Sequence, residues 1–209
     1  MDNEKWNSLV RSVRGESNDL RVALIVDSPW IPEFAGISHM EYYLEFDKWL
    51  KSNLDLYGRF PDIFFLPGFW VEYGMAAEAS GFGSRVRWSK DSLPTPHPII
   101  DDIGRVKDLV TPRPSKDGLM PFVIHNYRRV ERAIRDEGSE VKMVAARGPL
   151  AVASWIRGVT SLVKDVKKNP EEARRLFEIT TELIIDWLKE QEQVLSQVEG
   201  VLLLDDIVG

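Results

Sequence analysis

The chain has 209 residues, of which 44% are hydrophobic and 29% charged, a composition typical of one folded globular domain with a sizeable core. Its formal net charge is -6 and its basic residues are scattered, which argues against nucleic acid or an anionic membrane as a partner. It contains no cysteine, so these residues can form neither disulfides nor thiolate metal sites, and a reducing, cytoplasmic setting is expected.

The chain is predicted to form a single domain over residues 1–209 that begins with a helical segment, residues 1–19. Within that segment, residues 3–14 carry apolar side chains at helical spacing, and Gly15 supplies the stop. This region lacks the continuous apolar stretch of a signal peptide. Later apolar runs are interrupted by Pro, Gly or charge before they reach the length of a membrane span.

Four short apolar runs have the composition of buried strands and end at Asp, Pro, Gly or Arg residues. They cover residues 20–26, 63–66, 141–146 and 200–204. Between them, helical spacing predicts helices over residues 39–57, 72–80, 118–134 and 170–197, and residues 85–88 suggest a short extended piece. The stretch 89–121 is rich in proline and polar residues, and a loop of that length usually carries function or acts as a lid.

Strands that alternate with helices indicate parallel pairing through right-handed crossovers, and therefore an α/β fold. Both a doubly wound sheet and a (β/α) barrel satisfy this order. The last predicted strand is followed by only a few residues, although a parallel strand needs cover on both faces. We therefore expect the natural protein to continue beyond Gly209.

The clearest candidates for chemistry are the aspartates that follow predicted strands, because α/β proteins place reactive groups at the carboxyl ends of their strands. Asp205 and Asp206 follow the last strand and are the candidate catalytic residues; adjacent side chains point in opposite directions, so we expect one of them to face the site. Asp27 follows the first strand and is a candidate substrate-binding residue. The alternative is that these residues cap a loop or a helix.

Further candidate substrate-binding residues follow the first and third strands. Arg147 could clamp a carboxylate, and the adjacent Gly148 and Pro149 would let the backbone approach a ligand. Trp30 and Trp155 could form flat apolar walls of a pocket. The alternatives are a turn with a surface arginine, and tryptophans that belong to the core.

No metal site is predicted from this chain. Its three histidines, His39, His97 and His125, do not have the spacing of metal ligands. The pair Gly81 and Gly83 is too short for a dinucleotide-binding motif, and neither a phosphate-binding loop nor a nucleophile elbow is present.

Several segments, taken in their order and spacing, resemble the superfamily of uroporphyrinogen decarboxylases and corrinoid-dependent methyltransferases. The segments are Pro32-Glu33-Phe34, Arg59–Phe65, Lys116–Pro121, Gly148–Trp155, Asn169-Pro170-Glu171 and Leu204–Gly209. The resemblance implies a (β/α)8 TIM barrel, of which this chain covers the first half: four strands with their crossover helices over residues 20–209. It would then be a truncated barrel.

The sequence differs from the decarboxylases of this superfamily in three places. Their paired arginines for substrate carboxylates would precede Pro32-Glu33-Phe34, but residues 25–30 contain no arginine. Their substrate-binding aspartate falls on Pro67, and their pocket tyrosine falls on Trp155. These changes remove charge complementarity to a polycarboxylate.

The resemblance therefore favours a methyltransferase that exchanges a methyl group with a corrinoid protein. In that branch the corrinoid is carried by a partner, and zinc ligands, where used, come from the second half of the barrel. The alternatives are a decarboxylase of porphyrin biosynthesis and a non-catalytic half-barrel. Because exposed strand edges invite association, two copies could pair as a homodimer.

Overall fold

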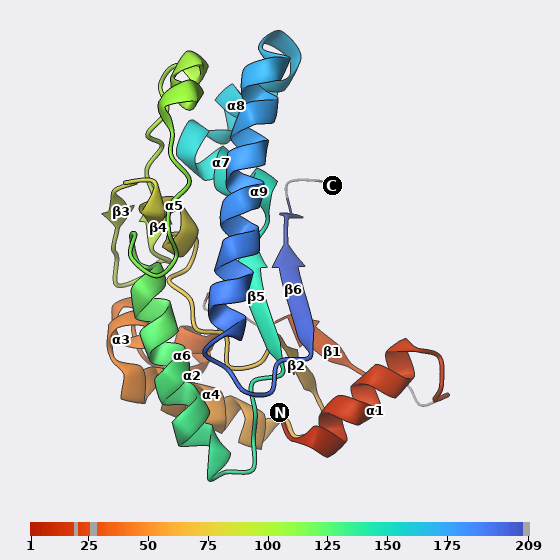
Figure 1. Ribbon diagram of the computed structural model, residues 1–209. Helices are drawn as coiled ribbons and strands as arrows, with labels where there is room; N and C mark the ends of the chain where they lie inside the picture. Colours follow the sequence, from red (N-terminus) through yellow and green to blue (C-terminus); the bar gives the residue numbers. More distant parts are fainter. Residues whose placement is uncertain (19–20, 26–28, 207–209) are drawn as a thin grey trace.

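The computed structural model describes residues 1–18, 21–25 and 29–206, and its elements alternate between strands and helices as an α/β protein requires (Figure 1). The first part contains α1 (Asn3–Val13), β1 (Ala23–Ile25), α2 (Ile31–Ala35), α3 (His39–Leu44), α4 (Phe46–Arg59), β2 (Phe64–Leu66) and α5 (Ala77–Gly81). A connecting region contains β3 (Val86–Arg87), β4 (Thr95–Pro96) and the 3-10 helix η1 (Ile103–Asp108). The last part contains α6 (Met120–Arg135), β5 (Met143–Arg147), α7 (Pro149–Arg157), α8 (Val159–Lys168), α9 (Pro170–Glu192) and β6 (Gly200–Leu204).

The four predicted strands are present as β1, β2, β5 and β6, but among the described residues they form separate pairs rather than one sheet. β1 pairs in parallel with β2, and β5 pairs in parallel with β6; β3 and β4 form a small antiparallel ribbon. The α/β class is therefore confirmed, whereas the expected half-barrel is not confirmed, because the sheets among the described residues are small and not closed.

Side chains take up hydrogen-bonding groups on the edge of β5 that faces away from β6. There the side-chain amide of Gln191 donates to the Ala145 carbonyl at 3.0 Å and accepts the Ala145 N–H at 3.4 Å. The next outward N–H on this edge, that of Arg147, donates to the Glu78 carboxylate at 3.1 Å. These side chains occupy the hydrogen-bonding positions that a neighbouring strand would need.

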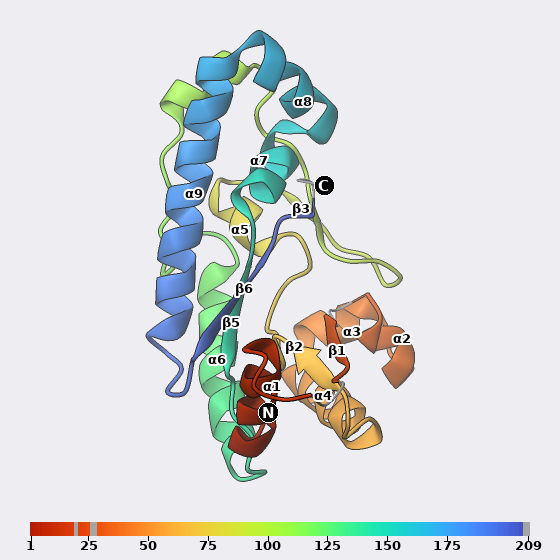
Figure 2. The ribbon, with the colours of Figure 1, turned by 90° about the vertical axis from the view of Figure 1, so that its right-hand side faces the viewer.

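The helices cover the two strand pairs from different sides. Figure 2 shows α6 and α9 on one side of β5 and β6, with β1, β2 and the helices α2, α3 and α4 on the other. A large core joins these layers and includes the fully buried Tyr127, Leu183 and Ile134, while a smaller core lies among η1, α7, α8 and α9. The helix α1 packs Trp6 and Leu9 against Phe64 of β2.

Several predicted boundaries are corrected by the structure. The single helix expected over residues 39–57 is two helices, because Glu45 has an extended backbone and ends α3 before α4 begins. The helix expected over residues 72–80 is only the short α5, and the long helix from Pro170 ends at Glu192. The proline-rich stretch contains β4 and η1 rather than a structureless loop. Within the described residues, no helix is both long enough and apolar enough to cross a membrane.

Candidate functional site

Asp205, predicted as a catalytic residue, lies against the N-terminus of α7. Its carboxylate accepts the backbone N–H of Ala151 at 2.7 Å and that of Leu150 at 3.1 Å. These N–H groups have no partner within the helix, and a negative charge is favoured at this end of the helix dipole. Asp205 therefore acts as a helix cap that connects the end of β6 to α7. Capping a helix was the alternative to a catalytic role in the sequence analysis.

Gly148 makes this arrangement possible. Its N–H donates to the Leu204 carbonyl at 2.6 Å, and a Cβ at this position would overlap the side chain of Asp205. Pro149 follows at the first position of α7, where the missing N–H is not required and the fixed φ angle suits a helix. Gly148 and Pro149 thus bring the two strand ends together; no ligand contact is needed to explain them.

Arg147, predicted to clamp a substrate carboxylate, is engaged by groups of the chain itself. One guanidinium nitrogen donates to the Glu72 carboxylate at 2.9 Å, and the guanidinium carbon lies 4.6 Å from the ring centroid of Trp70. The Arg147 and Glu72 side chains are only 12% and 6% exposed. Screening by solvent is weak at this depth, so the pair holds both residues in place.

Glu78 completes a buried group of charges beside Arg147. It is 4% exposed and accepts the Arg147 backbone N–H. Burial raises the pKa of Glu78 above its ordinary value, against the opposing effects of its backbone hydrogen bonds and of the Arg147 charge. The raised pKa makes it less favourable for Glu78 to add a second negative charge beside Glu72 in this buried site.

A tight turn after β2 brings Trp70 and Glu72 to this position. Phe69 adopts a left-handed backbone with φ of 50°, which is uncommon for a residue other than glycine and costs roughly 1–3 kcal/mol. Its N–H donates to the Tyr57 hydroxyl at 2.7 Å, and its ring packs 4.6 Å from that of Tyr57. Packing and hydrogen bonding therefore hold the strained turn that directs Trp70 under Arg147.

The other predicted site residues are not gathered into this cluster. Asp206 is exposed next to Asp205, and Trp155 is half-buried and packs against both cores. Trp30 is 46% exposed and stacks on Phe34 with ring centroids 5.0 Å apart. Asp27 lies outside the described residues.

Sequence reasoning missed Trp70, Glu72 and Glu78, which form the cluster with Arg147. Glu72 and Glu78 fell inside a segment predicted to be an ordinary helix. The available signal was the combination of Pro67, Gly68 and Gly74, which indicates an irregular backbone after a strand rather than a helix.

The described residues contain no group of three His, Cys, Asp or Glu side chains that could hold a metal ion. The chain as a whole has no cysteine. These residues therefore do not fit a zinc site built from this chain alone.

Parallel strands joined by helices, with polar residues where β5 and β6 end, define an α/β protein of the kind that builds its site at carboxyl strand ends. The family model for uroporphyrinogen decarboxylase (URO-D) matches residues 32–207. The chain belongs to the URO-D family.

Among solved structures, a methyltransferase from Methanosarcina mazei is similar to this chain, with a TM-score of 0.74 and 17% sequence identity. The match covers 96% of this chain and 58% of the methyltransferase, so the chain spans a little over half the length of that protein. At this identity the likeness concerns the fold. No protein with curated function matches this sequence.

Proposed function

We propose that this chain belongs to a methyltransferase that exchanges a methyl group between a small molecule and a corrinoid carried by a partner protein. The proposal is supported by membership of the URO-D family together with the similarity in fold to a protein named as a methyltransferase. The observation that carries it against decarboxylation is the engagement of Arg147 by Glu72.

A porphyrinogen carries several carboxylates, and its recognition requires cationic groups that are available to bind them. Arg147 is the arginine at the end of β5, and turning it toward a substrate would leave the buried Glu72 without that cation. Breaking such a pair costs about 3–5 kcal/mol. Residues 25–30, where the decarboxylases have arginines, contain none. A substrate without several carboxylates is therefore favoured.

In this proposal Asp205 and Asp206 have different roles. Asp205 is a positioning residue, because its carboxylate is already used by the N–H groups of α7. Asp206, exposed beside it, is the candidate catalytic residue: its carboxylate can accept a proton from, or orient, the group that receives the methyl. Zinc, where a relative uses it, stabilises a nucleophilic thiolate; the described residues do not provide its ligands, so no step is assigned to it.

The test is methyl transfer by the full-length protein from methylcob(III)alamin to a thiol or amine acceptor, followed by cobalamin absorbance and by mass spectrometry of the methylated product. We expect transfer, and we expect Asp206→Asn to reduce its rate about 100-fold or more if Asp206 is the proton acceptor. Asp136→Asn, an exposed change at the end of α6, should leave the rate unchanged. Absence of transfer with every acceptor, both from free methylcobalamin and from a methylated corrinoid protein, would refute the proposal.

The second candidate is a decarboxylase, because the matching family model is that of uroporphyrinogen decarboxylase. Release of carbon dioxide from uroporphyrinogen by the full-length protein, without methyl transfer, would establish it. A half-barrel that only binds would show neither reaction.

A further inference from the structure

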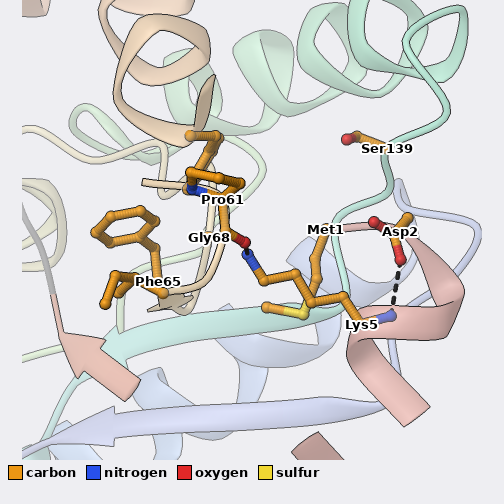
Figure 3. Close-up of a pocket in the computed structure, with 9 residues that line it drawn as sticks. Met1, Asp2, Lys5, Pro61, Phe65, Gly68 and Ser139 are labelled. Carbon is orange, nitrogen blue, oxygen red and sulfur yellow. Dashed lines mark hydrogen bonds between the residues drawn. The ribbon is translucent and has the colours of Figure 1, made fainter. Parts of the chain in front are cut away.

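A cavity of about 190 Å³ lies between the start of α1, the end of α4 and the strand β2 (Figure 3). Its lining includes Lys5, Tyr57, Pro61, Ile63, Phe65 and Ser139. It shares no residue with the group around Arg147. Tyr57 connects the two regions, because its hydroxyl accepts the Phe69 N–H in the turn that leads to Trp70.

Lys5 supplies a positive charge at this cavity. Its ammonium donates one hydrogen bond, to the Pro61 carbonyl at 2.7 Å, and in Figure 3 the side chain extends from α1 toward Pro61 and Gly68. Partial burial lowers the pKa of Lys5, against the opposing effect of the nearby Asp2 and Asp62 carboxylates, neither of which forms an ion pair with it among the described residues. The Asp2 carboxylate at the rim already accepts the Lys5 backbone N–H at 2.7 Å. The ammonium therefore has N–H groups available to an anion.

Tyr57 supplies a second donor. Its hydroxyl oxygen accepts the Phe69 N–H at 2.7 Å, and among the described residues no acceptor takes the hydroxyl hydrogen. Burial raises the pKa of Tyr57, so the hydroxyl stays protonated. Gly68, which also lines the cavity, lies beside this oxygen. Tyr57 and Gly68 therefore place this hydroxyl at the wall of the cavity.

The rest of the wall limits the ligand in size and kind. Ile63 and Phe65 provide apolar surface, and Ser139 adds a second hydroxyl to the lining. One water occupies about 30 Å³ of liquid, so the cavity holds about six waters or a few heavy atoms of a ligand. Sites for drug-sized molecules begin near 300 Å³, which excludes a porphyrinogen here.

We propose that this cavity binds a small carboxylic acid with a short aliphatic chain, its carboxylate on the Lys5 ammonium and the Tyr57 hydroxyl and its chain on Ile63 and Phe65. A cation and a hydroxyl donor, with apolar side chains beside them, match a carboxylate on a short hydrocarbon. The inference is independent of the proposed function, because it uses none of the residues assigned to methyl transfer.

The probes are acetate, propionate and butyrate, with butylamine and butanol as controls of the same length. Isotope-labelled protein is titrated with each, and the backbone amide signals are followed by nuclear magnetic resonance. We expect saturable shifts at Gly68 and Ser139, with affinity rising about fourfold for each added methylene. Butylamine and butanol should bind at least tenfold more weakly than butyrate.

Two variants separate the role of the charge from effects on folding. Lys5→Gln should weaken butyrate binding tenfold or more, whereas Lys51→Gln, an exposed lysine on α4, should not change it. Lys5→Arg keeps the charge and should retain binding even if Lys5→Gln fails to fold. Equal binding of butyrate and butylamine, unchanged affinity in Lys5→Gln, no saturable shifts, or shifts away from the cavity would each overturn the proposal.

Discussion

The carboxylate of Asp205 accepts the backbone N–H of Ala151 at 2.7 Å, although 54 positions separate the two residues in the sequence. The contact joins the carboxyl end of β6 to the first turn of α7. Asp205, which the sequence suggested as a catalytic residue, therefore has a structural role in this contact. The neighbouring Asp206 lies at the surface beside the helix.

We predict that Asp205→Ala lowers the free energy of unfolding by about 0.5–2 kcal/mol, the usual effect of losing a helix cap. Asp205→Asn keeps an acceptor oxygen and should lose less. The measurement is urea denaturation followed by circular dichroism. Asp206→Ala is the matched control, since Asp206 is exposed, and it should stay within about 0.5 kcal/mol of the wild type. Equal losses at both positions would show that Asp205 is not the cap.

Gly148→Ala tests the close approach of the two strand ends. The added Cβ would overlap an Asp205 side chain that is fixed by its hydrogen bonds, so we expect a loss of about 1–3 kcal/mol in unfolding free energy. Gly58→Ala in α4 meets no heavy atom within 4 Å and should stabilise the protein by up to about 1 kcal/mol. Combining Gly148→Ala with Asp205→Ala should cost less than the sum of the two changes. Strict additivity would contradict the overlap.

The buried pair of Glu72 and Arg147 can be tested by a double-mutant cycle. Arg147→Met leaves the Glu72 carboxylate buried without its partner and should cost about 3–5 kcal/mol in unfolding free energy. Adding Glu72→Gln should recover much of that loss. As a control, Arg174→Met breaks an exposed pair with Glu171 and should cost at most about 1 kcal/mol. A small effect of Arg147→Met, comparable to the control, would mean that the pair is exposed in solution.

Glu78 predicts a particular dependence of stability on pH. Because burial raises its pKa in the folded protein, the folded state holds the proton more tightly than the unfolded state does. The free energy of unfolding should therefore fall as pH rises from the ordinary glutamate pKa of 4.5 through the raised value in the folded protein. Glu78→Gln cannot titrate, and its Oε1 can still accept the Arg147 N–H. We expect denaturant unfolding to show this fall in the wild type and not in the variant; the opposite difference would refute the assignment.

The sequence predicted the positions of β1, β2, β5 and β6 because each is a short apolar run that ends at turn residues. It also predicted an α/β fold and the family, since the order of segments such as Gly148–Trp155 is distinctive. It did not predict that the strands form separate pairs. The side chains that occupy the free edge of β5, Gln191 and Glu78, lie 46 and 69 positions from the β5 residues they contact, so local pattern could not indicate them.

The candidate site was predicted only in part for the same reason. The location of Asp205 and Arg147 at strand ends follows from local pattern, but their partners come from distant segments. Glu72 contacts Arg147 although 75 positions separate them in the sequence. The turn that places Glu72 there contains Phe69 in a left-handed conformation, which residue propensities would not predict. A carboxylate at a strand end can serve a helix or a substrate, and only its neighbours in space distinguish the two.

Gln191 and Glu78 have a consequence beyond the arrangement of strands. The unpaired edge of a strand is a template on which another chain can add a strand, and exposed edges are a common origin of aggregation. Both outward groups of Ala145 and the outward N–H of Arg147 are already occupied by buried side chains of the same chain. β5 is therefore protected from pairing with a strand of another molecule. This protection lasts as long as α9 and α5 stay packed against it.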